Sequence, residues 1–390
     1  MHLAYTDEQE ALRAELRAYY DRLLDPDTRQ AIHDEPTGPV MRSVVKQMAA
    51  DGWLGIGWPV EYGGQGKGPM EQFIFFDESM RAGAPVPMLT INTVGPTIMQ
   101  FGTQEQKDFF LPKILAGEIH FCIGYSEPGA GTDLAAVRTK AERDGDEYVI
   151  NGSKLWTSYA ASADYCWLAV RTDPNVKKHK GISMIIVPMN TPGIEVRLLE
   201  LLGPHEIGAV HYDDVRVPVG NLVGGENMGW SLITNQLNHE RVTVCSPGMV
   251  DQVVTDVRRW AQETRLPDGR RVADQEWVQV NLAKAHAGFE FLRLINWKVA
   301  WQAENKQLSV EDASTTKVFG TEHYLDAVGW LLEIVGEAGY LTESSPGSVL
   351  RSRLQGMYRS LTILTFGGGT NEIQRDLIGV FGLGMPMAKR

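Results

Sequence analysis

The spacing of hydrophobic residues changes twice along the chain, and this change constrains the fold more than any other feature. Apolar residues recur at helical spacing up to about residue 115, in short strand-like runs from about His120, and at helical spacing again from Trp230. A chain of 390 residues is also too long for one ordinary core. We therefore expect an α+β protein with helices over residues 1–119, a β-domain over 120–226 and a helical bundle over 227–390.

The two helical regions differ in the length of their segments. Near the start, Leu12, Leu16 and Tyr20 recur at helical spacing after Thr6, which is a typical N-cap residue. Further helical patterns cover residues 40–51, 70–81 and 104–116. The last region contains longer patterns over residues 277–303, 312–336 and 350–364, and long helices with short connections predict an antiparallel bundle.

The middle region consists of short β-branched or aromatic runs separated by turns. Asn151 and Gly152 stand between two such runs and predict a hairpin, and Asp144 and Gly145 predict a second one. About 100 residues of this kind predict a small antiparallel barrel or sandwich.

Charge and cysteine content exclude several classes of function. The net charge of −12 argues against a nucleic-acid partner, because such binding depends on Lys and Arg displacing counterions. No apolar run is long enough to span a membrane, and the N-terminus lacks the pattern of a secretion signal. Cys122, Cys166 and Cys245 are isolated, which fits a reducing compartment and no metal site. We expect a cytoplasmic protein without a bound metal.

The first candidate site is the sequence YSEPGAGTD, residues 125–133, which follows a predicted strand. Its glycines, together with Ser126 and Thr132, offer backbone N–H groups and hydroxyls around a turn. These groups suit an acceptor-rich partner such as a flavin ring edge or a phosphate. A plain Gly/Pro turn is an equally good interpretation of the composition alone.

The second candidate site is KLWTS, residues 154–158. Trp156 beside the hydroxyls of Thr157 and Ser158 is suited to cover a planar heterocycle and to bond its edge. The competing interpretation is that Trp156 belongs to a core, as a Trp in a strand more often does.

The third candidate site is NHER, residues 238–241, on the helix expected to open the bundle. Asn238 and Arg241 are three residues apart and share a helix face, whereas Glu240 and Arg241 point in different directions. Spacing alone indicates that Glu240 is a surface glutamate and that His239 is a structural or surface histidine.

The fourth candidate site is TFGGGTNEIQR, residues 365–375. Three consecutive glycines before Thr370 and a helical pattern leave a helix N-terminus open to close approach by a ligand. Simple helix breaking is the alternative, but three glycines inside a helical region favour a ligand site.

Together these motifs resemble the acyl-CoA dehydrogenase family along essentially the whole chain. YSEPGAGTD resembles its first signature and TFGGGTNEIQRD its second, and NGSKLWTS and DVRVPVGNLVGGENMGW match as well. The resemblance implies an N-terminal helical domain, a middle antiparallel β-barrel domain and a C-terminal four-helix bundle. It also implies flavin-dependent α,β-dehydrogenation of an acyl-CoA thioester, with electrons passed to an electron-transfer flavoprotein.

The resemblance assigns a role to each candidate residue. FAD would lie between the β-domain and the bundle, and Asn238 and Arg241 would orient the acyl-CoA. Gly131 and Thr132 would lie near flavin and ligand phosphates. The residues expected to face or approach the cofactor are Tyr125, Ser126, Trp156, Thr157, Ser158, Thr370 and Glu372.

The first departure from the family pattern concerns the base that removes the α-proton. Many members carry it directly before the Gly-Thr of the second signature, where this chain has Gly368. A minority carry it in a Glu-Arg pair on the first bundle helix, which Glu240 and Arg241 match. We therefore expect Glu240 to be the catalytic base. Gly367 and Gly368 also remove side-chain volume, which suggests a bulky or branched acyl group such as a sterol side chain.

The second departure concerns subunit composition. Members commonly have an Arg-x-x-Phe-Gly element whose Arg reaches the FAD pyrophosphate of a neighbouring subunit, but residues 264–271 here read TRLPDGRR. Some actinobacterial relatives are α2β2 heterotetramers in which one subunit supplies the base and the other this Arg. We expect such a tetramer. Two alternatives to a catalytic dehydrogenase subunit are a non-catalytic FAD-holding subunit and an acyl-CoA oxidase.

Overall fold

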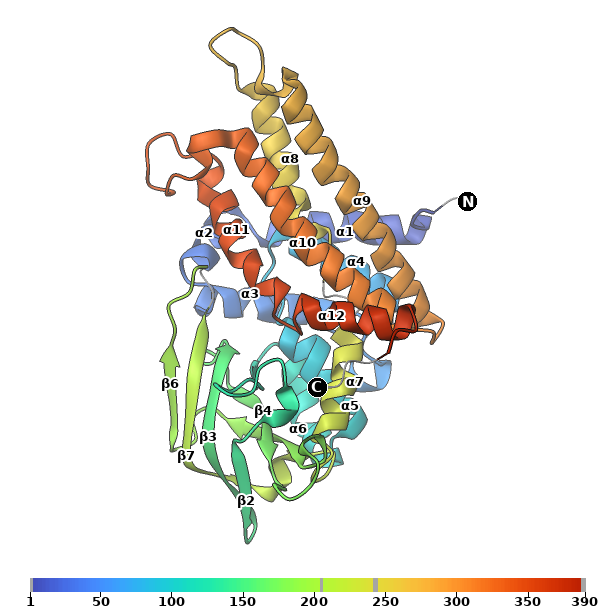
Figure 1. The fold of residues 1–390 in the computed structure, drawn as a ribbon, viewed down its shortest axis with the longest axis vertical. Coiled ribbons are helices and arrows are strands. Elements are labelled where there is room, and N and C mark those ends of the chain that lie inside the picture. Colours follow the sequence, from blue (N-terminus) through green and yellow to red (C-terminus); the bar gives the residue numbers. More distant parts are fainter. Residues whose placement is uncertain (1–2, 204–205, 241–244, 387–390) are drawn as a thin grey trace.

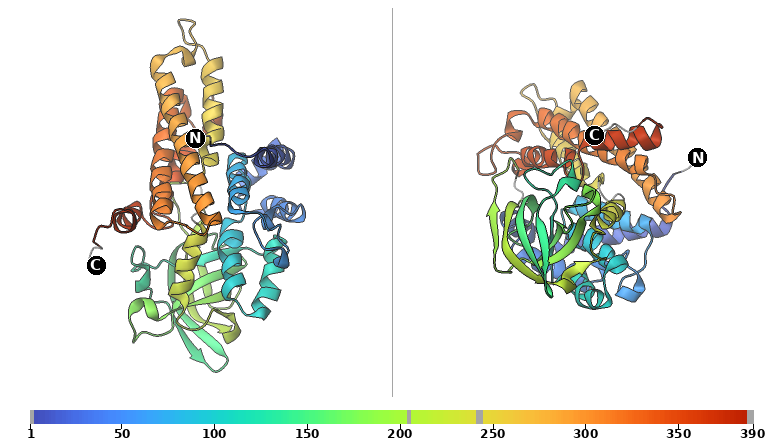
Figure 2. Two further views of the ribbon diagram at one scale, coloured as in Figure 1. Left: turned by 90° about the vertical axis from the view of Figure 1, so that its right-hand side faces the viewer. Right: turned by 60° about the horizontal axis from the view of Figure 1, so that its bottom comes forward.

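Two helical regions flank a β-sheet, which confirms the expected α+β class (Figure 1). The computed structural model describes residues 3–203, 206–240 and 245–386, and for residues 237–240 it describes the backbone alone. The long helices of the bundle stand at one end of the molecule and the sheet at the other, with the N-terminal helices beside both (Figure 2). The domain boundaries that we expect from the sequence stay a prediction.

The N-terminal helices begin at capping residues that the sequence makes recognisable. The Thr6 side chain accepts from the N–H of Gln9 while the Gln9 side chain accepts from the N–H of Thr6, and Thr103 and Gln106 repeat this arrangement. The helices are α1 (Asp7–Leu23), α2 (Pro26–Asp34), α3 (Pro39–Ala50), α4 (Pro69–Ala82), α5 (Gly95–Phe101) and α6 (Gln104–Leu115).

The sheet is mainly antiparallel. Its strands are β1 (Phe121–Gly124), β2 (Lys140–Asp144), β3 (Glu147–Ser158), β4 (Tyr165–Arg171), β5 (Ile182–Pro188), β6 (Ile194–Leu198), β7 (Ile207–Pro218) and β8 (Leu222–Val223). The strand order is β6-β7-β3-β2-β4-β5-β8, and β1 pairs with β4 off this path. The pairings of β4 with β1 and with β2 are parallel, and the other pairings are antiparallel.

One of the two predicted hairpins is wrong. Gly145 forms the expected turn with a φ of 62°, and β2 and β3 on either side of it pair antiparallel. Asn151 and Gly152, by contrast, lie inside the continuous strand β3. Gly152 marks a register irregularity against β7, and a Cβ there would come within 2.7 Å of the Thr139 Cα. The glycine is required by close strand packing and not by a turn.

The C-terminal region contains the predicted long helices. They are α8 (Gly248–Glu263), α9 (Glu276–Glu304), α10 (Val310–Val335) and α11 (Arg353–Leu361), which form the bundle, and the short α12 (Asn371–Leu377) lies at the end of the bundle nearer the sheet (Figure 1). The predicted helix over residues 350–364 is α-helical only within α11, with 3-10 turns on both sides.

The helix that we expected to open the bundle lies elsewhere. Helix α7 (Gly229–Glu240) packs against α5 and β5, in the lower half of Figure 1. Its buried residues Leu232 and Ile233 belong to the core shared by the N-terminal helices and one face of the sheet. The bundle has a separate core. The apolar side chains of α7 are covered by the N-terminal helices and the sheet, and for this reason α7 does not pack in the bundle.

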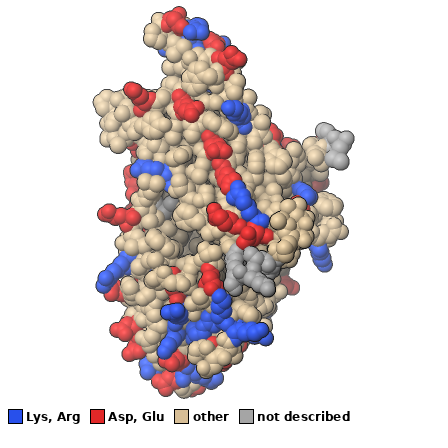
Figure 3. Space-filling model, viewed as in Figure 1, with Lys and Arg blue, Asp and Glu red and all other residues tan. Residues whose placement is uncertain are grey.

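The surface mixes both signs of charge, and Lys and Arg gather over the sheet-containing end of the face in Figure 3. Within the part of the chain that the structure describes, no helix is both long and apolar enough to cross a membrane. The same residues contain no group of three or more His, Cys, Asp or Glu side chains arranged to hold a metal ion. The three cysteines are free and buried. A cytoplasmic location stays a prediction.

Candidate active site

The YSEPGAGTD turn begins where β1 ends and closes at Glu127. Two backbone hydrogen bonds of 3.0 and 3.1 Å join Glu127 to Ala130 and fix the turn. Gly131 and Thr132 follow it and are exposed, and a Cβ added at Gly131 would meet no atom within 4 Å. This part of the turn is therefore open to a ligand.

A buried ion pair ties this turn to the KLWTS segment. The Lys154 Nζ donates to Glu127 Oε1 at 2.8 Å and to the Tyr125 carbonyl at 3.1 Å, and the Lys154 side chain is fully buried. Glu127 also accepts from the backbone N–H groups of Arg138 and Thr139 at 2.7 and 2.9 Å. Burial lowers the pKa of Lys154, while the charge of Glu127 opposes that shift. Two candidate sites far apart in sequence are thus held together.

A bulge near the end of β3 changes the direction in which its side chains point. The pairing of β3 with β7 shifts register between Lys154 and Thr157, and Trp156 there has a φ of 64°. As a result the Trp156 side chain is exposed, at 57%, whereas Thr157 is buried. The Thr157 hydroxyl has no hydrogen-bond partner among the described residues. A buried hydroxyl without a partner beside an exposed indole fits a site that a polar heterocycle completes.

A hydrogen bond connects the same turn to α7. The Tyr125 hydroxyl donates to Gln236 Oε1 at 2.6 Å, and Gln236 is buried. Gln236 lies one helical turn before Glu240, the last residue of α7. The backbones of Asn238 and Glu240 are therefore placed on this helix, whereas their side chains and all of Arg241 lie outside what the structure describes.

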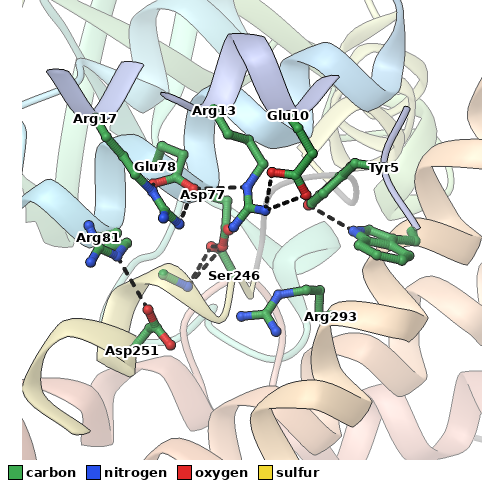
Figure 4. A network of polar contacts seen from close by, with 12 residues as sticks. Tyr5, Glu10, Arg13, Arg17, Asp77, Glu78, Arg81, Ser246, Asp251 and Arg293 are labelled. Carbon is green, nitrogen blue, oxygen red and sulfur yellow. Dashed lines mark hydrogen bonds and ion pairs between the residues drawn. The ribbon is translucent and has the colours of Figure 1, made fainter. Parts of the chain in front are cut away.

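The chain is anchored again after α7, at Ser246 and Gly248. Asp77 of α4 accepts from the Gly248 N–H at 2.8 Å and from the Ser246 hydroxyl (Figure 4). Burial raises the pKa of Asp77 while these hydrogen bonds lower it. The neighbouring Glu78 points to α1, where it pairs with Arg13 and Arg17 at 3.1 and 2.8 Å. Helix α4 therefore links the N-terminal helix to the start of α8.

The glycine-rich loop leads into α12. Gly368 and Gly369 have φ values of 67° and 93°, which favour glycine. A Cβ at Gly368 would meet nothing within 4 Å, so backbone conformation and not crowding explains this glycine. Thr370 caps α12 by accepting from the Ile373 N–H at 3.2 Å, and Glu372 is exposed in its first turn. The expected open helix N-terminus is thus partly satisfied by its own threonine.

Hydrogen bonds join the turn to the end of β3 and, through Gln236, to α7, the helix whose backbone carries Asn238 and Glu240. The glycine-rich loop is bonded instead to α10, through Lys317. The sequence motifs did not single out Gln236 or Lys317, and they gave no role to Lys154. Lys154 could have been noticed as a lysine between the apolar positions of a predicted strand. Gln236 and Lys317 lie on helices among many other polar residues and do not stand out in this way.

Comparisons with known proteins agree with this arrangement. The acyl-CoA dehydrogenase N-terminal, middle and C-terminal domain models match residues 6–118, 122–215 and 227–382. Acyl-CoA dehydrogenase FadE26 of Mycobacterium tuberculosis is 53% identical over 100% of both chains. A chain of the ChsE4-ChsE5 complex from the same species is 54% identical with a TM-score of 0.94, and a chain of the Tcur3481-Tcur3483 steroid ACAD is 48% identical with a TM-score of 0.94, each over 100% of both chains.

The resemblance inferred from the motifs is therefore confirmed at the level of the family and of its actinobacterial, sterol-type subgroup. Full-length coverage leaves no part of the fold unmatched. This chain belongs to the acyl-CoA dehydrogenase family and is an acyl-CoA dehydrogenase.

Proposed function

We propose that this chain carries out FAD-dependent α,β-dehydrogenation of an acyl-CoA, with Glu240 as the base. The observation that carries the proposal is the Tyr125–Gln236 hydrogen bond, which joins the expected flavin turn to the helix one turn before Glu240. The unpartnered Thr157 hydroxyl and the exposed Trp156 fit a flavin edge. When bound, FAD would accept the hydride that leaves the β-carbon.

The residues of the chain supply binding, orientation and proton removal. Tyr125, Ser126, Trp156, Thr157 and Ser158 would hold the ring system. Phosphates would lie near Gly131 and Thr132, and the cofactor would also be approached by Thr370 and Glu372. Glu240 would take the α-proton while Asn238 and Arg241 orient the thioester. A carboxylate is a suitable base where burial disfavours its charged form.

The base assignment is tested by Glu240→Gln. The variant retains the size of the side chain but cannot accept the α-proton, so kcat should fall by about 10²- to 10⁴-fold while flavin content is unchanged. Flavin absorbance and turnover of the assembled enzyme measure both quantities. Full turnover by the variant would instead favour a non-catalytic, FAD-holding subunit. Oxygen consumption during turnover of the unmodified enzyme would indicate an oxidase.

We propose a bulky or branched acyl group as substrate, with a sterol side chain as the specific candidate. The description of one close structural relative as a steroid ACAD supports this, as do the glycines that replace side chains at Gly367 and Gly368. Comparison of kcat/KM for a sterol-side-chain thioester and a straight medium-chain thioester tests it. Equal values for the two substrates would contradict the proposal.

We propose that the chain works in an α2β2 tetramer with a second acyl-CoA dehydrogenase-like subunit and passes electrons to an electron-transfer flavoprotein. The heteromeric complexes among its structural relatives support the hetero-oligomer. The arginines of the α8–α9 loop form hydrogen bonds and ion pairs within that loop, and none of them stands in the Arg-x-x-Phe-Gly element that is common in the family. Their partners are the Gly269 carbonyl for Arg265, Asp268 for Arg270 and Asp274 for Arg271.

An exposed face of α9 supports the same assembly. Trp277, Val280, Phe291, Leu294 and Trp301 are each more than 40% exposed. They fall on one series of alternating three- and four-residue steps, which places them along a single stripe of the helix. We propose that this α9 stripe packs against a helix of the partner subunit.

A further inference from the structure

Lys317 of α10 holds both ends of the glycine-rich loop. Its Nζ donates to the Thr365 carbonyl at 3.1 Å and to Asn371 Oδ1 at 2.6 Å, and the residue is only 3% exposed. Thr365 lies directly before the loop and Asn371 directly after it. The loop between them includes three consecutive glycines, which lose more conformational freedom on ordering than other residues. Such a loop needs anchors outside itself.

Asn371 extends this anchor along α10. Its Nδ2 donates to Thr321 Oγ1 at 3.0 Å and to Glu322 Oε1 at 3.1 Å. Arg375, one turn further along α12, donates to both carboxylate oxygens of Glu322 at 2.8 Å. Helix α12 is therefore fixed to α10 through Asn371, Arg375 and the ammonium of Lys317.

The same stretch of α10 also holds the segment that follows Glu240. The Cys245 thiol donates to the Lys317 carbonyl at 3.8 Å, and the Tyr324 hydroxyl donates to the Ser246 carbonyl. Gly320 permits this approach, because a Cβ there would come within 2.6 Å of the Cys245 Cβ. Residues 245–248 thus rest on α10. Asp77 holds them from the other side, and Figure 4 shows it beside Ser246.

Placing an ammonium group at this point is energetically unfavourable. Burial lowers the pKa of Lys317 to about 8, although the carboxylates of Glu372 and Glu322 act in the opposite direction. A buried lysine whose hydrogen bonds go to a loop carbonyl and to the Asn371 amide oxygen organises that loop.

We propose that Lys317 is a positioning residue that fixes the glycine-rich loop relative to residues 245–248, the segment that follows Glu240. Its ammonium orders residues 365–371, and its carbonyl receives the thiol of Cys245. Without the ammonium, the loop samples other conformations and the FAD site on the bundle side loses its shape. This inference rests on the proposed function insofar as the loop contributes to the cofactor site, but the ordering of the loop is independent of it.

The test compares Lys317→Met with the exposed control Lys140→Met in the enzyme assembled with its partner. Hydrogen exchange should become at least about tenfold faster in Lys317→Met only, at the hydrogen-bonded amides of Phe366, Gly367, Ile373 and Gln374, since each anchor that is lost lowers local stability. Retained FAD after ultrafiltration should fall, and KM should rise more than kcat falls. Unchanged exchange at these amides, or equal changes in both variants, would overturn the proposal.

A second variant tests the same proposal even if Lys317→Met fails to fold. Asn371→Leu removes the acceptor while Lys317 remains, and it should increase exchange at the same amides. The effect of the double variant on exchange should be smaller than the sum of the two single effects, because both single variants remove the same Lys317–Asn371 hydrogen bond. Additive effects would contradict the proposal. The two proposals can fail separately. Full turnover by Glu240→Gln would contradict the proposed function, whereas faster loop exchange in Lys317→Met would still support the positioning role of Lys317.

Discussion

At the scale of single residues, buried charges organise the candidate site. Lys154 and Glu127 form an ion pair whose side chains are 0% and 7% exposed, and it fastens the turn that carries Tyr125 to the strand that carries Trp156. A buried pair of this kind is costly to form but more costly to break on one side, because the remaining charge then lacks a partner.

Lys154→Met should therefore destabilise the protein by about 3–5 kcal/mol, whereas the exposed control Lys140→Met should change stability by less than about 0.5 kcal/mol. Urea unfolding measures both. Replacing both partners, by Lys154→Met with Glu127→Leu, should recover part of the loss. A double variant less stable than Lys154→Met alone would contradict this account of the pair.

The pair also predicts a pH dependence. Burial raises the pKa of Glu127, but Lys154 and the hydrogen bonds from Thr139 outweigh it, so the pKa lies below the ordinary 4.5. A carboxyl with a lowered pKa stabilises the fold above its ordinary pKa, and this contribution disappears as the pH falls through the lowered value. The stability difference between wild type and Glu127→Gln should accordingly shrink below about pH 4.

At the scale of elements, α9 has two faces with different roles. Its buried residues, among them Phe289 and Leu292, belong to the core of the bundle, while the α9 stripe is exposed. A long apolar stripe on a surface helix is typical of an interface.

Phe291→Asp should weaken assembly with the partner subunit by at least about tenfold, because a charge at the centre of an apolar interface must be desolvated. Sedimentation of mixed subunits measures the association. The control is His286→Asp, an exposed position of α9 that lies farther round the helix than any residue of the stripe. Circular dichroism should show the same helix content in both variants. Equal association of both variants with the partner would rule out the stripe as the contact.

At the scale of the whole molecule, two separate cores meet where the cofactor is expected. One core joins the N-terminal helices, one face of the sheet and α7, and the other fills the bundle. Contacts such as Asp77 with Gly248 bridge them. We propose that FAD lies between the β-domain and the bundle and that an arginine from another subunit neutralises its pyrophosphate.

Purification of this chain with and without the partner subunit tests that dependence. Flavin absorbance should be strong for the pair and weak for the chain alone, because the pyrophosphate charge is then not neutralised. Native mass determination should show a complex of four chains. Full flavin occupancy in the isolated chain would contradict a shared site.

The sequence by itself determined the order of helices, strands and helices, because hydrophobic period and capping are local properties. Thr6 and Thr103 cap their helices with neighbours three residues away, and Gly145 turns a hairpin within two residues. The family, the candidate turn and the glycine-rich loop were also recognisable from continuous motifs. The roles assigned to Glu240, Asn238 and Arg241 stay predictions.

Only the tertiary structure decided how these pieces meet. The run around Gly152 continues as one strand because β2 and β7 pair along it, and no local signal reports those neighbours. Likewise α7 leaves the bundle because its apolar face is covered by α5 and β5. Lys154 and Lys317 bond to partners tens of residues away, and such pairs depend on burial that a linear pattern cannot express.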